Sequence, residues 1–167
     1  TDVADVIRSD RIMTGANMVG KSVFGQTGRI STDGETTSQI EVYLPYGAEQ
    51  VNLGIYDINS GALIRSIVSG PQSSGTASFG WDGRMADGRP APAGDYVIRG
   101  TANIDGAATD VNPSTFAKVE TVSWDAQSAN LNLNLSGGVT LPISEVSRIG
   151  ETPKSLPLTN QIEQAGE

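Results

Sequence analysis

Residues 15–22, GANMVGKS, match a phosphate-binding motif letter for letter. In a motif of the form G-x-x-x-x-G-K-[ST], backbone amides at a helix N-terminus and the lysine side chain hold the phosphates of a nucleotide. The motif requires a buried strand before it and a helix after it. Here the apolar residues before the motif recur at helical spacing, so a helix and not a strand precedes it. Val23–Gly28, which follows it, contains two glycines and cannot form a stable helix. We therefore predict a helix end followed by a strand entry, and no nucleotide site.

Aspartates that adjoin aromatic residues or glycines form a second set that could do chemistry: Asp82, Asp87, Asp95, Asp105 and Asp125. Two carboxylates beside tryptophans could hydrolyse glycosides. However, Asp82-Gly83 and Asp87-Gly88 are turn dipeptides, in which Asp binds its own backbone and Gly supplies a positive φ. A calcium loop fails as well, because Arg84 stands where the pattern needs Asp or Asn. We therefore predict no catalytic residue, no cofactor and no metal site.

The two tryptophans could together form a platform that stacks on sugars. Trp81 continues the apolar face of Ala77 and Phe79, which favours a place in the core. Trp124 ends a strand, and an exposed tryptophan there would be a candidate contact residue. Trp124 is therefore the candidate for an interface, and Trp81 is not.

The composition excludes several further chemistries. The 167 residues include no cysteine and no histidine, so disulfides, thiolate zinc sites and Ser-His-Asp triads are impossible. A net charge of −8 at pH 7 with few lysines argues against nucleic acid as a partner. No apolar stretch approaches the roughly 20 residues of a membrane-spanning helix, so we expect no membrane insertion. No complete catalytic constellation remains, and we do not expect an enzyme.

The elements that must position these side chains are mostly strands, because apolar and polar residues alternate with period two beyond residue 18. The predicted strands are 39–44, 51–55, 62–68, 77–81, 96–104, 116–124 and 131–135. Asn59-Ser60-Gly61 predicts a hairpin turn. The strand at 131–135 has two distinct faces, one of Leu131, Leu133 and Leu135 and one of Asn130, Asn132 and Asn134, and Gly137-Gly138 then turns the chain into 139–149. Short strands at this spacing are typical of a β-sandwich.

Two polar junctions, near Thr36 and Gly106, divide the strands into groups. Between them, residues 37–106 are predicted to form the sandwich. The strands on either side are too few to make a domain alone, since three or more strands with a shared face are usually needed. We therefore expect residues 18–36 and 107–150 to pair with each other as a small, discontinuous β-barrel into which the sandwich is inserted.

The two ends of the chain have different patterns. Residues 1–17 are the best helix candidate, because apolar residues recur at three- and four-residue spacing and Asp2 and Asp5 lie in the first turn. We interpret this segment as a short helical leader. Residues 151–167 contain Pro153 and Pro157 and no sustained period, so we expect a flexible tail.

Residues 79–96, FGWDGRMADGRPAPAGDY, resemble the Ig-like module of the flagellar hook-capping family, also called hook assembly scaffold or rod-modification proteins. Residues 51–68, VNLGIYDINSGALIRSIV, resemble the preceding strand pair of that module. Similar segments occur in Ig-like domains of many secreted bacterial enzymes and adhesins, so the flanks must discriminate. Residues 18–23, MVGKSV, resemble the start of the family's core, and residues 139–150 its closing strands. The resemblance thus covers both predicted domains.

The resemblance implies an all-β fold, in which a fibronectin-III/Ig-like sandwich is inserted into a Tudor-like barrel. It also implies that nine residues are a structural signature: Phe79, Trp81, Asp82, Gly83, Asp87, Gly88, Pro92, Gly94 and Tyr96. Each has a structural reason, because the aromatics fill a small core and the Asp-Gly pairs fix turns. The chain corresponds to the family's core, and we expect it to lack the family's N-terminal leader.

For function, the resemblance implies a non-enzymatic scaffold. Such a protein would form a homo-oligomeric cap at the distal end of the growing flagellar hook, outside the cell, after export through the flagellar channel. Its partners would be hook protein subunits, whose polymerisation it would promote, and copies of itself. A candidate interface is the set Trp124, Asn130, Asn132 and Asn134. The alternative is an Ig-like binding module of a secreted or surface bacterial protein, which predicts sugar binding and no role in the flagellum.

Overall fold

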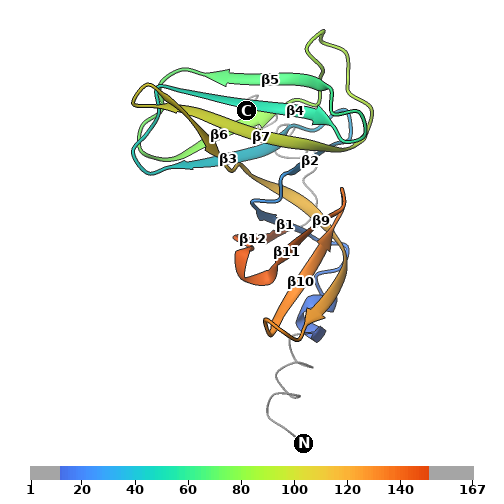
Figure 1. Cartoon of the computed structure of the whole chain (residues 1–167). Coiled ribbons are helices and arrows are strands. Elements are labelled where there is room, and N and C mark those ends of the chain that lie inside the picture. The colour runs from blue at the N-terminus through green and yellow to red at the C-terminus, as the bar shows by residue number, and fades with distance from the viewer. Residues whose placement is uncertain (1–11, 151–167) are drawn as a thin grey trace, which may run out of the picture.

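The computed structural model describes residues 12–150, and it shows two β-rich lobes joined end to end (Figure 1). Alternating apolar residues build the strands of both lobes, as the sequence predicts. The strands of the upper lobe are β2 (Arg29–Thr32), β3 (Ser38–Leu44), β4 (Gln50–Asp57), β5 (Leu63–Ser69), β6 (Gly75–Trp81), β7 (Gly94–Ile104) and β8 (Ala107–Val111). The lower lobe contains β1 (Ser22–Gly25), β9 (Ser114–Asp125), β10 (Asn130–Leu135), β11 (Val139–Pro142), the short 3₁₀ helix η1 (Ile143–Glu145) and β12 (Arg148–Gly150).

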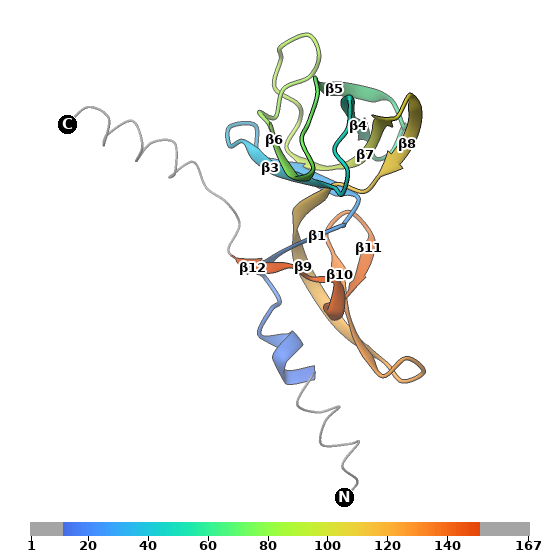
Figure 2. The same cartoon turned by 90° about the vertical axis from the view of Figure 1, so that its left-hand side faces the viewer.

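The upper lobe is a sandwich. One sheet has the order β2-β7-β4-β5, with β8 also paired to β7, and the opposing layer is formed by β3 and β6. Figure 2 shows these two layers on opposite sides of the lobe. Inward residues of both layers form one core, whose largest fully buried side chain is Trp81. Figure 1 shows no helix in this lobe, so its core is enclosed by the two layers of strands and by their connecting loops.

The lower lobe is built on an antiparallel sheet in the order β11-β10-β9-β1-β12, and we refer to this lobe as the barrel. Its core is a separate apolar cluster that includes Val23, Val119 and the leucine face of β10. A register shift lies between Asn134 and Leu135, where Thr121 pairs with Asn134 but Val119 pairs with Leu135. The extra β9 residue, Glu120, makes this a β-bulge, which bends a strand and increases its twist.

The 12-residue strand β9 belongs to both lobes. Its first residues, Ser114 and Thr115, pair with β3 of the sandwich, and the rest pairs with β1 and β10 of the barrel. Figure 1 shows β9 descending from the sandwich into the lower lobe. The chain passes between the lobes here and at residues 26–28, between β1 and β2. Two connections thus join two separate cores.

The observed pairing moves both predicted boundaries of the sandwich. Residues 18–36 and 107–150 were expected in the barrel, with 37–106 as the sandwich. Instead β2 pairs with the start of β7 and β8 pairs with its end, so both strands belong to the sandwich sheet. Their sequences, RIST and AATDV, are short and show no alternation of large apolar and polar residues, so they resemble loops. The division into a sandwich and a discontinuous barrel remains our proposal, with the sandwich extended to 29–111.

The ends of the described region bear on two further predictions. Residues 12–16 are helical and β1 follows at Ser22, so the phosphate-loop match lies between a helix and a strand, as predicted. The rest of the predicted helical leader, 1–11, and the predicted flexible tail, 151–167, lie outside the described residues. Within residues 12–150, no helix has the length and apolar character needed to cross a membrane.

Candidate functional site

Residues 79–96, the signature segment, contain three aromatic residues, of which Trp81 and Tyr96 are buried and bonded to the segment's own loop. Trp81 and Tyr96 meet edge to face, with ring centroids 5.4 Å apart. The indole Nε1 of Trp81 donates a hydrogen bond of 2.9 Å to the carbonyl oxygen of Arg84. The Tyr96 hydroxyl donates to the carbonyl oxygen of Pro92, four residues upstream, as in the tyrosine corner of Ig-like sandwiches. Neither ring presents a surface on which a sugar could stack.

Asp82 and Asp87, the two aspartates among the nine signature residues, act as turn residues. Asp82 Oδ1 accepts the backbone amide of Arg84 at 3.0 Å and also receives Arg65 Nη1 at 2.9 Å. Asp87 accepts the Arg89 amide at 3.0 Å and the Arg89 guanidinium Nε at 2.7 Å. The amide of Arg89, followed by its side chain, lowers the pKa of Asp87. Both carboxylates are therefore engaged in hydrogen bonds that stabilise the loop.

The remaining signature residues shape the same loop. Gly83, Gly88 and Gly94 all have positive φ, of 79°, 88° and 145°. A Cβ on Gly83 would lie 2.4 Å from Thr32 Oγ1, whereas a Cβ on Gly88 would meet nothing within 4 Å. Phe79 packs partly buried on the sandwich core. The whole segment is thus explained by turn geometry and core packing.

The asparagines of β10 lie on one face, opposite the buried leucines. Asn134 is engaged within this face: its Nδ2 donates to Thr121 Oγ1 at 2.9 Å and its Oδ1 accepts Thr140 Oγ1 at 3.1 Å. Asn130 and Asn132 are half-buried, opposite Asp125 and Ser123 of β9. The face offers amide and hydroxyl groups without net charge at its centre, which suits hydrogen bonding to another polypeptide.

Trp124 is half-buried, and it packs against the barrel core rather than standing on the surface. It pairs with Leu131 across the β9–β10 ladder. The asparagines point to the opposite face of β10, so the structure separates Trp124 from the other three members of the candidate interface.

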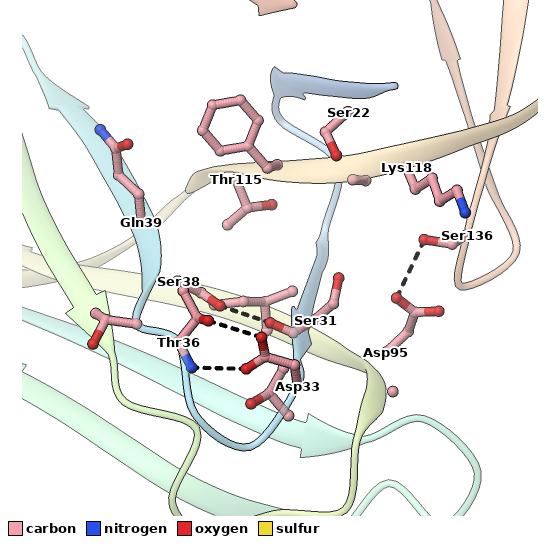
Figure 3. Close-up of a pocket in the computed structure, with 16 residues that line it drawn as sticks. Ser22, Ser31, Asp33, Thr36, Ser38, Gln39, Asp95, Thr115, Lys118 and Ser136 are labelled. Carbon is pink, nitrogen blue, oxygen red and sulfur yellow. Dashed lines mark hydrogen bonds between the residues drawn. The ribbon is translucent and has the colours of Figure 1, made fainter. Parts of the chain in front are cut away.

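A groove of about 320 Å³ lies at the junction of the lobes, and sequence reasoning did not find it (Figure 3). Half of its lining residues are Ser or Thr, and several of their hydroxyl groups are bonded within the chain. Ser38 Oγ donates to the Ser31 carbonyl at 2.7 Å, and Ser136 Oγ donates to Asp95 at 3.2 Å. The lining residues come from both lobes and are far apart in the sequence, so no local pattern could have indicated them. The groove is the seam between the lobes.

Turn aspartates also hold the loops around this seam and elsewhere. Asp33 Oδ1 accepts the amides of Thr36 and Glu35 at 2.7 and 2.8 Å, and these bonds lower the pKa of Asp33. Amides of Ser60 and Asn59 lower the pKa of Asp57 in the same way. The charged form of each carboxylate is thus favoured by folding.

These pKa shifts predict an acid-dependent loss of stability. A carboxyl whose pKa is lowered in the folded state stabilises the fold above its unfolded pKa, and this contribution is lost as pH falls through the folded value. We expect the free energy of unfolding to decline as pH drops below 3.8, the ordinary value for Asp. Asp33→Asn keeps the acceptor but cannot titrate, so it should be less stable than the parent at pH 7. Urea titrations should show that difference shrinking in acid; a difference independent of pH would contradict the assignment.

The fold and these surfaces define a class of protein: a structural β-module in which polar side chains serve turns and contacts between lobes. Within residues 12–150, no three acidic side chains gather in a cluster that could hold a metal ion. The family model of the FlgD Ig-like domain matches residues 27–106, a range that includes β2 as the pairing does. The basal-body rod modification protein FlgD of Escherichia coli (strain K12) is 34% identical over 133 residues, covering 80% of this chain and 57% of that protein.

Solved structures agree with this match over both lobes. The crystal structure of FlgD from P. aeruginosa has a TM-score of 0.70 at 30% identity, covering 80% of this chain and 98% of that one. FlgD from Xanthomonas campestris, whose structure was described as giving insights into the hook capping essential for flagellar assembly, has a TM-score of 0.63 at 28% identity. That comparison covers 84% of this chain and 100% of the other. The chain belongs to the FlgD family. It spans 57% of the length of the Escherichia coli relative.

Proposed function

We propose that this chain is the core of a non-enzymatic scaffold that caps the growing flagellar hook and promotes polymerisation of exported hook protein. The observation that carries the proposal is the match to FlgD proteins across both lobes, beyond the Ig-like module alone. The roles of the signature residues support it, because each is occupied by turn or core contacts of its own loop. The scaffold acts outside the cell, at the distal end of the hook.

The physical task of such a scaffold is capture. An exported subunit that arrives disordered pays conformational entropy when it orders at the hook tip. A cap that holds the subunit there raises its effective concentration and favours insertion over escape. Several copies of the chain around the tip would enclose the site, so the cap is a homo-oligomer. Its partners are hook subunits and other copies of itself.

We place one contact surface of this cap on the asparagine face of β10, defined by Asn130, Asn132 and Asn134. An antiparallel sheet with one buried and one polar face can receive a partner through side-chain amides without first exposing its core. Asn134 is tied to Thr121 and Thr140 and orders the face, while Asn130 and Asn132 have no such bond between side chains among the described residues. Trp124 would add contact at the end of the β9–β10 hairpin.

Deleting the gene in its source bacterium tests the proposed function. Without a cap, exported hook subunits diffuse away, so we expect basal bodies with rods and no hooks in electron micrographs. We also expect hook protein in the culture medium. Normal hooks in the deletion strain would overturn the capping role and favour the alternative, an Ig-like binding module of a secreted or surface protein.

Complementing that strain tests the asparagine face. The double variant Asn130→Lys and Asn132→Lys places two charges on a face that a partner would desolvate, and hook formation should fall about tenfold or more. Asn52→Lys, on an exposed position of β4 in the sandwich, is the matched control and should restore hooks. Full restoration by the double variant would remove the asparagine face from the proposal and leave the capping role untouched.

A further inference from the structure

Side-chain contacts join the sandwich to the barrel at separate places around the junction, and we call each of these places a tie. On one side, Arg148 of β12 in the barrel forms an ion pair with Glu41 of β3 in the sandwich, with Nη2 3.1 Å from Oε2. The same guanidinium carbon lies 4.0 Å from the ring centroid of Phe24 and 5.8 Å from that of Phe116. The two rings are themselves in contact, with centroids 4.8 Å apart. Arg148 is therefore positioned by aromatic rings of the barrel, and its guanidinium group forms an ion pair with the sandwich.

A second tie uses the β10–β11 turn of the barrel. Arg29 of β2 donates from Nε to the carbonyl oxygen of Gly137 at 2.8 Å. Next to it, Ser136 Oγ donates to Asp95 of β7 at 3.2 Å (Figure 3). A Cβ on Gly137 would lie 3.0 Å from the Arg29 side chain, so the turn approaches the arginine closely. This tie involves a different edge of the barrel from β12, because β11 and β12 lie at opposite ends of its strand order.

Between these ties, buried hydroxyl groups join the lobes. Thr27 Oγ1 and Thr115 Oγ1 are 2.6 Å apart, and each lies within hydrogen-bond distance of the carbonyl oxygen of Arg29. The two hydroxyl hydrogens can fill two of these three contacts at a time. Both threonines are almost fully buried, at 5% and 1% exposure. A hydrogen bond shielded from water is electrostatically stronger than an exposed one, so these contacts favour the closed junction. Opening the junction would break this network.

We propose that the sandwich and the barrel are held at one fixed angle, and that Arg148 and Arg29 are the positioning residues that set it. Two connecting segments with separate cores would by themselves form a hinge, since inter-domain motion is the default where contacts are few. Ties on two edges around a buried centre oppose rotation in both directions. The proposal concerns geometry alone and stands whether or not the chain caps the hook. For any assembly scaffold, such a lock would fix where the sandwich surface points relative to the barrel.

Spin labels can measure the angle, because the chain has no native cysteine to interfere. Cysteines at Ser66 of β5 and Gln127 of the β9–β10 turn, both exposed, carry one nitroxide on each lobe. Pulsed dipolar spectroscopy should give a single narrow distance distribution in the otherwise unchanged chain. In Arg148→Ala with Arg29→Ala we expect that maximum to be lost to a broad distribution, while circular dichroism remains that of the folded lobes.

Arg65→Ala is the matched control, since it removes an arginine whose ion pair with Asp82 lies wholly within the sandwich. It should keep the narrow distribution. Arg148→Lys is the milder variant that retains the charge and loses the flat contact with the rings, and we expect an intermediate broadening. A narrow, unshifted distribution in the double alanine variant would overturn the proposal, and so would a broad distribution in the parent chain. Broadening by Arg65→Ala equal to that of the double variant would also overturn it, because the effect would not belong to the junction.

Discussion

Replacing Trp81 with alanine is expected to lower the free energy of unfolding by about 3–5 kcal/mol. The side chain has no exposed surface, so its removal leaves a cavity at the centre of the sandwich core. It also removes the edge-to-face contact with Tyr96 and leaves the Arg84 carbonyl without its indole donor. A domain of about 80 residues is typically stable by roughly 4–12 kcal/mol. The loss therefore approaches the stability of the whole sandwich, and urea denaturation followed by circular dichroism measures it.

Two further variants separate the causes. Trp81→Phe keeps a ring against Tyr96 but lacks the indole N–H, so it should be destabilised less than Trp81→Ala. Trp124→Ala removes the same side chain from a half-buried place on the barrel, and we expect a smaller loss than for Trp81. Equal losses for Trp81→Ala and Trp124→Ala would contradict the assignment of Trp81 to the centre of a core. In either variant, the remaining tryptophan reports by fluorescence on the other lobe.

The class of fold could be predicted because the most regular strands show the alternation of apolar and polar residues within their own sequence. In β10 the leucines at alternate positions are buried and the asparagines between them are not, as period two requires. In β9 the same rule fails, although its residues are equally apolar. Val119 is buried at an odd position, yet Val122 and Trp124 pack on the same core from even positions. The bulge at Glu120 reverses the alternation, and only the pairing with β10 reveals it.

Edge strands were harder to predict than central ones. β2 and β8 both pair on one side only with β7, so neither needs a full apolar face. β2 buries Ile30 and Thr32, of which only Ile30 is apolar, and β8 buries no side chain. Without large apolar residues at alternate positions neither segment shows a period of two, so the sequence favours a loop. This explains why the predicted sandwich began and ended too far inside the chain.

The junction could not be predicted because nothing local encodes it. The contacts from Thr115 to Arg29, from Arg148 to Glu41 and from Arg29 to Gly137 join residues 86, 107 and 108 positions apart. Each is an ordinary residue of a short strand or turn when viewed in its own segment. The signature segment is the opposite case, because the side-chain hydrogen bonds made within it join residues two to four positions apart. The turns of the signature segment could therefore be predicted from the sequence, and the contacts between the lobes could not.

Gly83→Ala is expected to destabilise the sandwich more than Gly88→Ala, although both glycines lie in the same loop with similar φ. A left-handed backbone costs a non-glycine residue roughly 1–2 kcal/mol, and both variants pay this. Only at Gly83 does the new Cβ collide, 2.4 Å from Thr32 Oγ1, which adds about 1–3 kcal/mol of overpacking. The buried Thr32 has little room to yield, because its Oγ1 already accepts the Gly34 amide at 2.9 Å. Urea denaturation of both variants measures the difference.

A double-mutant cycle shows whether the collision is the cause. Thr32→Ala removes the oxygen that the new methyl group would strike, at the expense of the bond to Gly34. If the collision explains the difference, Gly83→Ala in the Thr32→Ala background should cost about as much as Gly88→Ala, and the two changes should be strongly non-additive. Additive effects would instead mean that Gly83 is needed for its backbone conformation alone. The Thr32 side chain would then not be the reason that this turn needs glycine. The contact between β2 and the signature loop would tolerate a larger residue at position 83.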